Sequence, residues 1–209
     1  MRAKHHARFF KTGQGEYGEG DIFLGIKVPD VRKVARIYKS ISLDVISELL
    51  ELKYHECRLL ALIVLVNNYS RTKSKEERVK LGRFYLDNLK GVNNWDLVDI
   101  SASKILYEYS IEHPEMFDEL LLDDNLWKNR IAIMATWPYI RLNKFTLTLN
   151  LSERLLTHPH DLIHKAVGWM LRELGKRDKF LLMQFLEAHY NKIPRTALRY
   201  AIEKIPETQ

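Results

Sequence analysis

The chain has 209 residues, of which 33 are Lys or Arg and 27 are Asp or Glu, so its formal net charge is +6. A hydrophobic fraction of 46% with nine Gly and six Pro excludes a disordered, collagen-like or low-complexity protein. The single cysteine, Cys57, excludes an intrachain disulfide and a multi-thiolate metal site, and it favours a reducing, cytoplasmic setting. The surplus of positive charge indicates an anionic partner.

No segment predicts export or membrane insertion. The basic opening stretch MRAKHHARFF is followed by KTGQGEYGEGD and not by the apolar region of a secretory signal. The longest aliphatic run, residues 59–66, is far shorter than the roughly 20 residues that span a bilayer. We therefore expect a cytoplasmic protein with no membrane partner.

Hydrophobic residues recur at helical spacing along almost the whole chain, most clearly at Leu59, Leu62, Ile63 and Val66. Helix-start residues occur in the order Asp30, Ser42, Asn94, Pro114, Asn125, Pro159, Asp161 and Pro194. Pro138 should kink or end a helix. Residues 145–151 (FTLTLNL) alternate as a strand does, but their helical flanks lead us to predict a helix there as well.

The helices recur as repeats. Aligning HECRLLAL, LVDISASK, KNRIAIMA, IHKAVGWM and TALRYAIE puts one column of residues in register: Arg58, Asp99, Arg130, Lys165 and Arg199. Their intervals are 41, 31, 35 and 34 residues, close to a two-helix repeat of about 35–45 residues. We therefore predict an all-α fold, a right-handed superhelical solenoid of HEAT- or armadillo-like repeats. It should form a single domain over residues 1–209, with residues 1–21 less regular.

Charge is segregated between neighbouring helices. Residues 112–125 hold six acids and no base, whereas residues 126–141 hold three bases and no acid. If one helix of each repeat lines a concave side, that side is basic and suits a polyanion such as a nucleic-acid duplex. The alternative is ordinary variation between exposed helix faces.

Three further motifs carry little functional signal. The glycines of GQGEYG (residues 13–18) match a dinucleotide-binding pattern in letters, but the required strand and βαβ unit are missing. His158, His160 and His164 are not joined by a carboxylate or thiolate cluster, so we expect no metal site. Cys57 has no convincing base partner and is expected to be a buried small hydrophobe.

One constellation does suggest chemistry. Trp95 and Asp99 are four residues apart, so both project from the same face of one helix. Asp99 is the acid in the otherwise basic column, and Trp169 lies four residues after Lys165. Two indoles, a carboxylate and cations would suit a positively charged ring beside a phosphate. The alternative is that both tryptophans pack in the core and that Asp99 pairs with Arg130.

The blocks FLGIKVP (23–29), NNWDLVD (93–99), WKNRIAIM (127–134) and HKAVGWMLRELGK (164–176) resemble the DNA alkylation repair family of HEAT-like-repeat glycosylases, the AlkD-like proteins. The resemblance covers about residues 20–205. It implies a monofunctional DNA glycosylase without a cofactor. Such enzymes release cationic N-alkylpurines, such as 3-methyladenine and 7-methylguanine, from duplex DNA without flipping the base into a pocket.

The resemblance also implies roles for particular residues. Trp95 and Trp169 resemble paired indoles that contact the lesion deoxyribose. Asp99 resembles the catalytic carboxylate, and Arg130 the arginine beside it at the phosphate. A cationic purine leaves without protonation, so the developing sugar cation is what Asp99 would stabilise while it aligns water. We expect further DNA contacts from the basic residues Lys165, Arg58, Arg172 and Arg199.

The N-terminal region departs from the family pattern. Active relatives carry a helix there that closes over the lesion strand and contributes an aromatic residue. Here the segment KTGQGEYGEGD has four glycines, which makes it a poor helix, and Tyr17 lies near the expected aromatic position. This departure favours the first alternative function, a non-catalytic DNA-structure-binding member of the family. The other alternative, a protein-binding HEAT scaffold, is disfavoured by the Trp95, Asp99, Arg130 and Trp169 set, and no obligate protein partner is evident.

Overall fold

A computed structural model describes residues 2–205 of the chain. The chain divides into two compact units, Met1–Pro114 (unit 1) and Glu115–Gln209 (unit 2). Within the described residues, the regular secondary structure is helical apart from one isolated bridge between Ile22 and Tyr54. The all-α prediction is confirmed, while a single domain over residues 1–209 stays a prediction.

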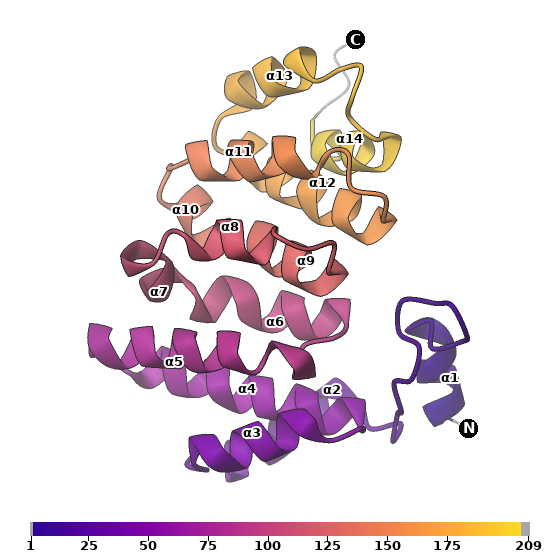
Figure 1. Ribbon diagram of the computed structural model, residues 1–209, viewed down its shortest axis with the longest axis vertical. Helices are drawn as coiled ribbons and strands as arrows, with labels where there is room; N and C mark the ends of the chain where they lie inside the picture. Colours follow the sequence, from indigo (N-terminus) through magenta and orange to yellow (C-terminus); the bar gives the residue numbers. More distant parts are fainter. Residues whose placement is uncertain (1, 206–209) are drawn as a thin grey trace. The chain divides into compact units, whose positions relative to one another are not determined.

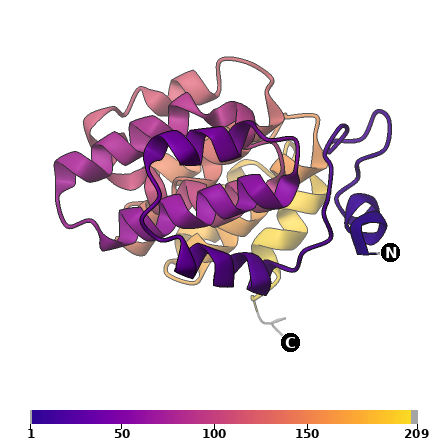
Figure 2. The same cartoon turned by 90° about the horizontal axis from the view of Figure 1, so that it is seen from below.

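Unit 1 is a stack of helices built around α4. Its elements are α1 (Arg2–Phe9), α2 (Val28–Ile37), α3 (Leu43–Glu51), α4 (His55–Arg71), α5 (Lys75–Asp87), the short 3-10 helix η1 (Leu89–Gly91), α6 (Trp95–Ile105) and α7 (Tyr107–Glu112). Helix α4 packs against α2, α3 and α6, and its run from Ala61 to Leu65 is buried. Helix α1 lies beside this stack and not within it (Figures 1 and 2).

Unit 2 is built around α12 in the same way. Its helices are α8 (Met116–Leu120), α9 (Leu126–Met134), α10 (Trp137–Arg141), α11 (Thr146–Leu155), α12 (Asp161–Gly175), α13 (Lys179–Ala188) and α14 (Arg195–Ile202). Helix α12 packs against α9, α11, α13 and α14. Residues 145–151, which alternate as a strand does, form the N-cap and first turns of α11, so the helix prediction is confirmed. The helical pattern around Pro138 is interrupted: α9 ends at Met134, and α10 begins at Trp137 with Pro138 in its first turn.

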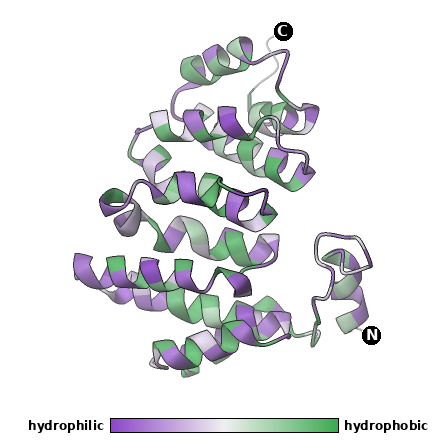
Figure 3. Cartoon of the chain, viewed as in Figure 1, coloured by the Kyte–Doolittle hydropathy of each residue, from purple (hydrophilic) through white to green (hydrophobic). Residues whose placement is uncertain are grey.

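Side chains at helix starts fix where several helices begin. The Ser42 hydroxyl accepts a hydrogen bond from the Val45 amide, and the Asn94 and Asn125 side chains cap α6 and α9. These three predictions are confirmed. The Asp161 prediction is wrong, because the His160 ring caps α12 by accepting from the Leu162 amide. Hydrophobic and hydrophilic residues are interspersed along the helices (Figure 3), and in α3 the hydrophobic Ile46 and Leu50, one turn apart, are buried.

Two glycines in the sequence blocks permit close backbone contacts. Gly25 has a φ of +83°, and a Cβ there would lie 2.7 Å from the Ala3 nitrogen, so glycine allows α1 to approach. A Cβ at Gly168 would lie 2.5 Å from the Ala197 carbonyl oxygen. Glycine at position 168 therefore lets α12 and α14 pack closely.

The N-terminal region is partly helical. Residues 1–21 were expected to be less regular, yet α1 covers Arg2–Phe9. The glycine-rich stretch that follows is not helical, as predicted, and it folds as turns in which the Glu16 amide donates to the Gly13 carbonyl. Among the residues described, no helix is both long and apolar enough to cross a membrane.

Candidate functional site

Helix α6 presents Trp95 and Asp99 on one face. Both side chains are partly exposed, while Leu97 and Val98 between them are fully buried. The Asn94 side chain accepts a hydrogen bond of 2.9 Å from the Trp95 amide and so fixes the first residue of the helix. A capped helix with a buried opposite face holds the indole and the carboxylate one turn apart.

Aromatic rings from the N-terminal residues flank the Trp95 indole. The Phe10 ring stacks on it with centroids 5.3 Å apart and an interplanar angle of 23°. Phe9 meets it edge-on at 6.0 Å. Sequence reasoning missed both phenylalanines because it looked for the aromatic residue at Tyr17. Tyr17 lies in the turns after α1, and its expected DNA contact stays a prediction.

A buried charged cluster lies at the start of α6. The His55 ring bridges two carboxylates, with Nδ1 2.8 Å from Oδ2 of Asp21 and Nε2 2.9 Å from Oδ2 of Asp96. The Arg58 guanidinium donates to the other oxygen of Asp21. We call His55, Asp21, Asp96 and Arg58 the His55 cluster. Sequence reasoning missed it, because Asp21 and Asp96 lie 34 and 41 residues from His55 and no periodic pattern links them.

The His55 cluster favours the charged forms of His55 and Asp21. Burial acts to lower the pKa of His55, but the hydrogen bonds and charges of Asp21 and Asp96 raise it to about 9. Burial likewise acts to raise the pKa of Asp21, yet the His55 hydrogen bond and the Arg58 charge bring it below its usual value. His55 is therefore an imidazolium at neutral pH.

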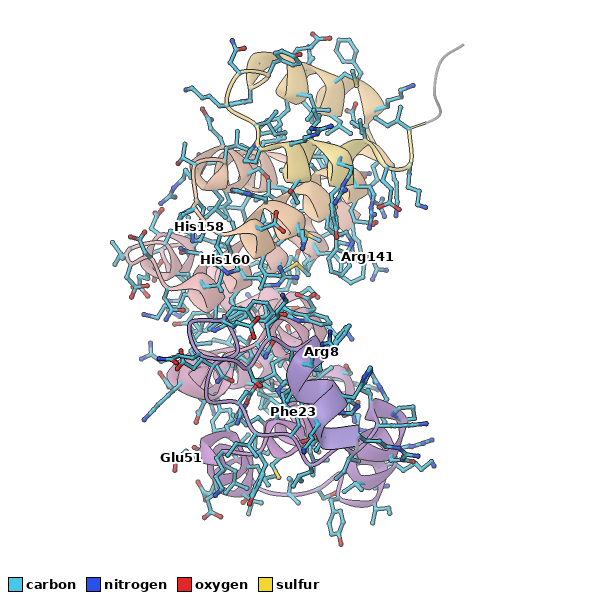
Figure 4. The ribbon with its side chains drawn as sticks, turned by 90° about the vertical axis from the view of Figure 1, so that its right-hand side faces the viewer. Arg8, Phe23, Glu51, Arg141, His158 and His160 are labelled. Carbon is cyan, nitrogen blue, oxygen red and sulfur yellow. The ribbon has the colours of Figure 1, made fainter. Side chains whose placement is uncertain are left out.

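A cavity of about 410 Å³ borders this cluster. Its lining is largely apolar and includes the Phe9, Phe10 and Phe23 rings beside His55 and Asp96. Figure 4 shows Phe23 close to α1, whose exposed Arg8 projects outward. The aromatic residues next to Trp95 are thus partly open to solvent.

Arg58 has a different environment from the one its alignment column predicts. It is only 5% exposed, and Nη1 donates to the Leu52 carbonyl at 2.8 Å while the other arm of the guanidinium binds Asp21. To reach a phosphate, the Arg58 guanidinium would have to leave these buried partners. Burial and pairing therefore argue against the DNA contact expected of Arg58, which stays a prediction.

In unit 2, α9 and α12 carry the other predicted residues. Arg130 is 4% exposed, and its Nη1 donates to the Leu162 carbonyl at 2.5 Å, so its guanidinium is fixed against the first turn of α12. Lys165 and Trp169 are partly exposed and share a face of α12. Lys165 forms an ion pair of 2.8 Å with Asp161.

Two further arginines of unit 2 were expected to contact DNA. Arg172 lies one turn beyond Trp169 on α12 and is paired with Glu203 and, at 3.9 Å, with Glu173. Arg199 on α14 is exposed, with its guanidinium 6.0 Å from the centre of the Tyr200 ring. Exposure leaves Arg199 accessible to a phosphate, whereas Arg172 would have to exchange carboxylate partners.

The three histidines before and within α12 organise the start of that helix. The His160 amide donates to Nδ1 of His158 at 3.0 Å, and Nε2 of His164 donates to the His158 carbonyl at 2.6 Å (Figure 4 labels His158 and His160). Burial lowers the pKa of His158 and of His160. Within residues 2–205, no group of three or more His, Cys, Asp or Glu side chains has a geometry that could hold a metal ion.

Comparisons with known proteins agree with this fold. The family model described as "DNA alkylation repair enzyme" matches residues 1–205. A similar solved structure is "Predicted DNA alkylation repair enzyme from Enterococcus faecalis", which is 18% identical with a TM-score of 0.71 over 99% of this chain and 96% of that chain. At that identity the likeness shows the fold, and it supports the predicted helical-repeat class. None of the curated proteins compared with this chain matches it. Because the family model spans nearly the whole sequence, the chain belongs to the DNA alkylation repair enzyme family.

Proposed function

We propose that this chain is a monofunctional DNA glycosylase that hydrolyses the N-glycosidic bond of cationic N-alkylated purines in duplex DNA without a cofactor. One observation carries the proposal beyond family membership. Trp95 and Asp99 are both partly exposed, one turn apart, on a face of α6 whose opposite side is fully buried. An indole and a carboxylate held at that spacing can stabilise one positive charge together.

The reaction suits a carboxylate and needs no general acid. The alkylated purine already carries a positive charge, so it leaves with the electron pair of the glycosidic bond and becomes neutral. The sugar is left with a developing cation at its anomeric carbon. In this proposal the Asp99 carboxylate stabilises that cation, and it aligns the water whose oxygen forms the new bond and whose proton is released.

The indoles and basic residues have supporting roles. Trp95 and Trp169 are proposed to present their ring faces to the lesion deoxyribose, where a ring face attracts positive charge. Arg130 is proposed as a phosphate contact, which requires its buried guanidinium to exchange the Leu162 carbonyl for a phosphate oxygen. Lys165 and Arg199 are proposed to bind the phosphates of the duplex.

The test compares base release with DNA binding. In single-turnover assays on methylated duplex DNA, Asp99→Asn should lower the rate of 7-methylguanine release about 100-fold, because a preorganised electrostatic group is lost. Its Kd for DNA should stay close to that of the wild type. Asp44→Asn, the same change at an exposed acid on α3, is the matched control and should alter neither value. Equal release by wild type and Asp99→Asn would overturn the role of Asp99.

A second candidate function is a non-catalytic DNA-structure-binding protein of the same family. The observation that favours it is the Phe10 ring, which covers one face of the Trp95 indole. If the wild type binds DNA in a salt-sensitive way but releases no alkylated base, this second function is the correct one. If it neither binds DNA nor releases base, a protein-binding scaffold is left.

A further inference from the structure

His55 joins two parts of unit 1 that are distant in sequence. One is the N-terminal segment (residues 2–27), which ends in the stretch that carries Asp21. The other is the first turn of α6, which carries Asp96. The His55 side chain is 2% exposed and lies 2.8 Å from the Asp21 carboxylate and 2.9 Å from the Asp96 carboxylate. A single buried ring therefore connects the N-terminal segment to α6.

Both hydrogen bonds of the His55 ring require a ring that is protonated on both nitrogens. Each carboxylate can only accept, so both His55 ring nitrogens must donate, and only an imidazolium can do so. Arg58 supplies the second positive charge, so the His55 cluster contains two cations and two anions. Breaking such a buried set by removing one charge is strongly unfavourable, which makes the arrangement rigid.

The same part of α4 holds the N-terminal segment at further points. The His55 amide donates to the Ile22 carbonyl at 2.9 Å. The buried Glu56 carboxylate accepts from the amides of Leu24 and Gly25 at 2.8 Å each. The N-terminal segment is thus fastened to the start of α4 through its main chain as well as through Asp21.

Two routes lead from His55 to the Trp95 indole. The first runs through Asp96, the next residue after Trp95 in the first turn of α6. The second runs through stacked rings. Phe23 lies 4.4 Å from the His55 ring and 4.9 Å from Phe10, and Phe10 stacks on Trp95 at 5.3 Å. His55 is therefore linked to Trp95 both through the main chain at Asp96 and through the Phe23 and Phe10 rings.

We infer that His55 is a positioning residue of the proposed glycosylase site. It fixes the Trp95 indole, and the first turn of α6 that leads to Asp99, through its bond to Asp96 and through the Phe23 and Phe10 rings. The inference rests on the proposed function, and it extends that function to a residue that contacts no DNA. It also gives the N-terminal segment a role, because Asp21 and Phe10 hold the site from that side.

The first experiment reads the position of Trp95 directly and needs no enzymatic activity. The indole N–H signal of Trp95 is assigned in a ¹H–¹⁵N spectrum with Trp95→Phe. In Asp96→Asn and His55→Gln that signal should shift or broaden. Glu108→Gln is the matched control. It removes a part-buried charge that pairs with Arg78 between α7 and α5, outside the His55 cluster. An unmoved Trp95 signal in folded Asp96→Asn and His55→Gln protein would overturn the inference.

The second experiment separates positioning from stability. At a temperature where every variant is folded, His55→Ala should lower the single-turnover rate of base release about 10- to 100-fold, the cost of a misplaced catalytic geometry. The Kd for DNA should change far less. His55→Gln keeps one donor and should recover part of the rate, and Glu108→Gln should match the wild type.

The outcomes distinguish this inference from the proposed function. If the wild type releases no base, the glycosylase proposal fails, while the Trp95 signal still decides whether His55 positions the indole. If the wild type is active and all His55 variants release base at its rate, the inference is wrong. If His55→Gln does not fold, the near-isosteric Asp96→Asn variant carries both measurements.

Discussion

The Phe10 ring stacks on the Trp95 indole with centroids 5.3 Å apart and an angle of 23° between the planes. This contact joins the N-terminal segment to the helix that carries the candidate catalytic carboxylate. It also bears on both candidate functions. A ring on one face of Trp95 can orient the indole for the lesion, or it can keep DNA from that face.

Phe10→Ala is the direct test of this contact. Removing a partly buried ring that stacks on Phe23 and Trp95 should lower the free energy of unfolding by about 1–3 kcal/mol. Urea unfolding followed by circular dichroism measures this change. Phe180→Ala, at a ring that is 73% exposed on α13, should change it by less than about 0.5 kcal/mol. A Phe10→Ala protein as stable as the wild type would show that the stack contributes nothing to folding.

The His55 cluster predicts a loss of stability at alkaline pH. The pKa of His55 is raised to about 9 from its ordinary value of 6.5 because Asp21 and Asp96 bond to the charged ring, so folding favours the protonated form. This stabilisation is complete below about pH 6.5 and is lost as pH rises through about 9. The free energy of unfolding should therefore fall by about 2–3 kcal/mol between about pH 7 and pH 10.

Asp96→Asn is the control for this pH dependence. It removes one of the two charges that raise the pKa of His55. The free energy of unfolding of this variant should therefore begin to fall at a lower pH than that of the wild type. Arg58 keeps its pair with Asp21 in both proteins, which leaves the rest of the His55 cluster comparable. Coincident pH curves for the two proteins would contradict the assignment of the decline to His55.

Close packing of α12 and α14 predicts that Gly168 does not tolerate a side chain. A Cβ there would meet the Ala197 carbonyl oxygen at 2.5 Å and the Tyr200 Cβ at 2.5 Å, so one helix must move. Gly168→Ala should lower the free energy of unfolding by about 2 kcal/mol or more. Gly13→Ala is the control, because its Cβ would meet only the Glu16 side chain at 2.9 Å, which can turn away. Similar losses for the two variants would argue against the close packing.

The DNA contacts predict a change in salt dependence. Arg199→Ala and Lys165→Ala should each weaken DNA binding and reduce the slope of log K against log salt by about 0.9, the share of one phosphate contact. Asp161→Asn should strengthen binding, because it frees Lys165 from its 2.8 Å ion pair. Arg58→Lys should leave the slope unchanged, because that residue is buried against Asp21. A slope change for Arg58→Lys equal to that for Arg199→Ala would support Arg58 as a DNA contact.

Local patterns in the sequence determined the helices and part of the candidate site. Caps at Ser42, Asn94 and Asn125 act within three residues of themselves, so they can be identified without a structure. The shared face of Trp95 and Asp99 follows from the helical period alone. The spacing of the repeats likewise identified the helical-repeat fold.

Which charges are buried and paired depends on how distant segments of the chain pack together. His55 meets Asp21 and Asp96 across 34 and 41 residues of sequence, and no periodic pattern encodes contacts at that range. For the same reason Arg58 and Arg199 occupy one alignment column but differ in burial and in charge partners. Arg58 is buried against a carboxylate from the N-terminal segment, whereas Arg199 on α14 is exposed to solvent. A residue's place on a helix is set by its neighbours in sequence, whereas its burial and charge partners depend on which distant segment packs against it.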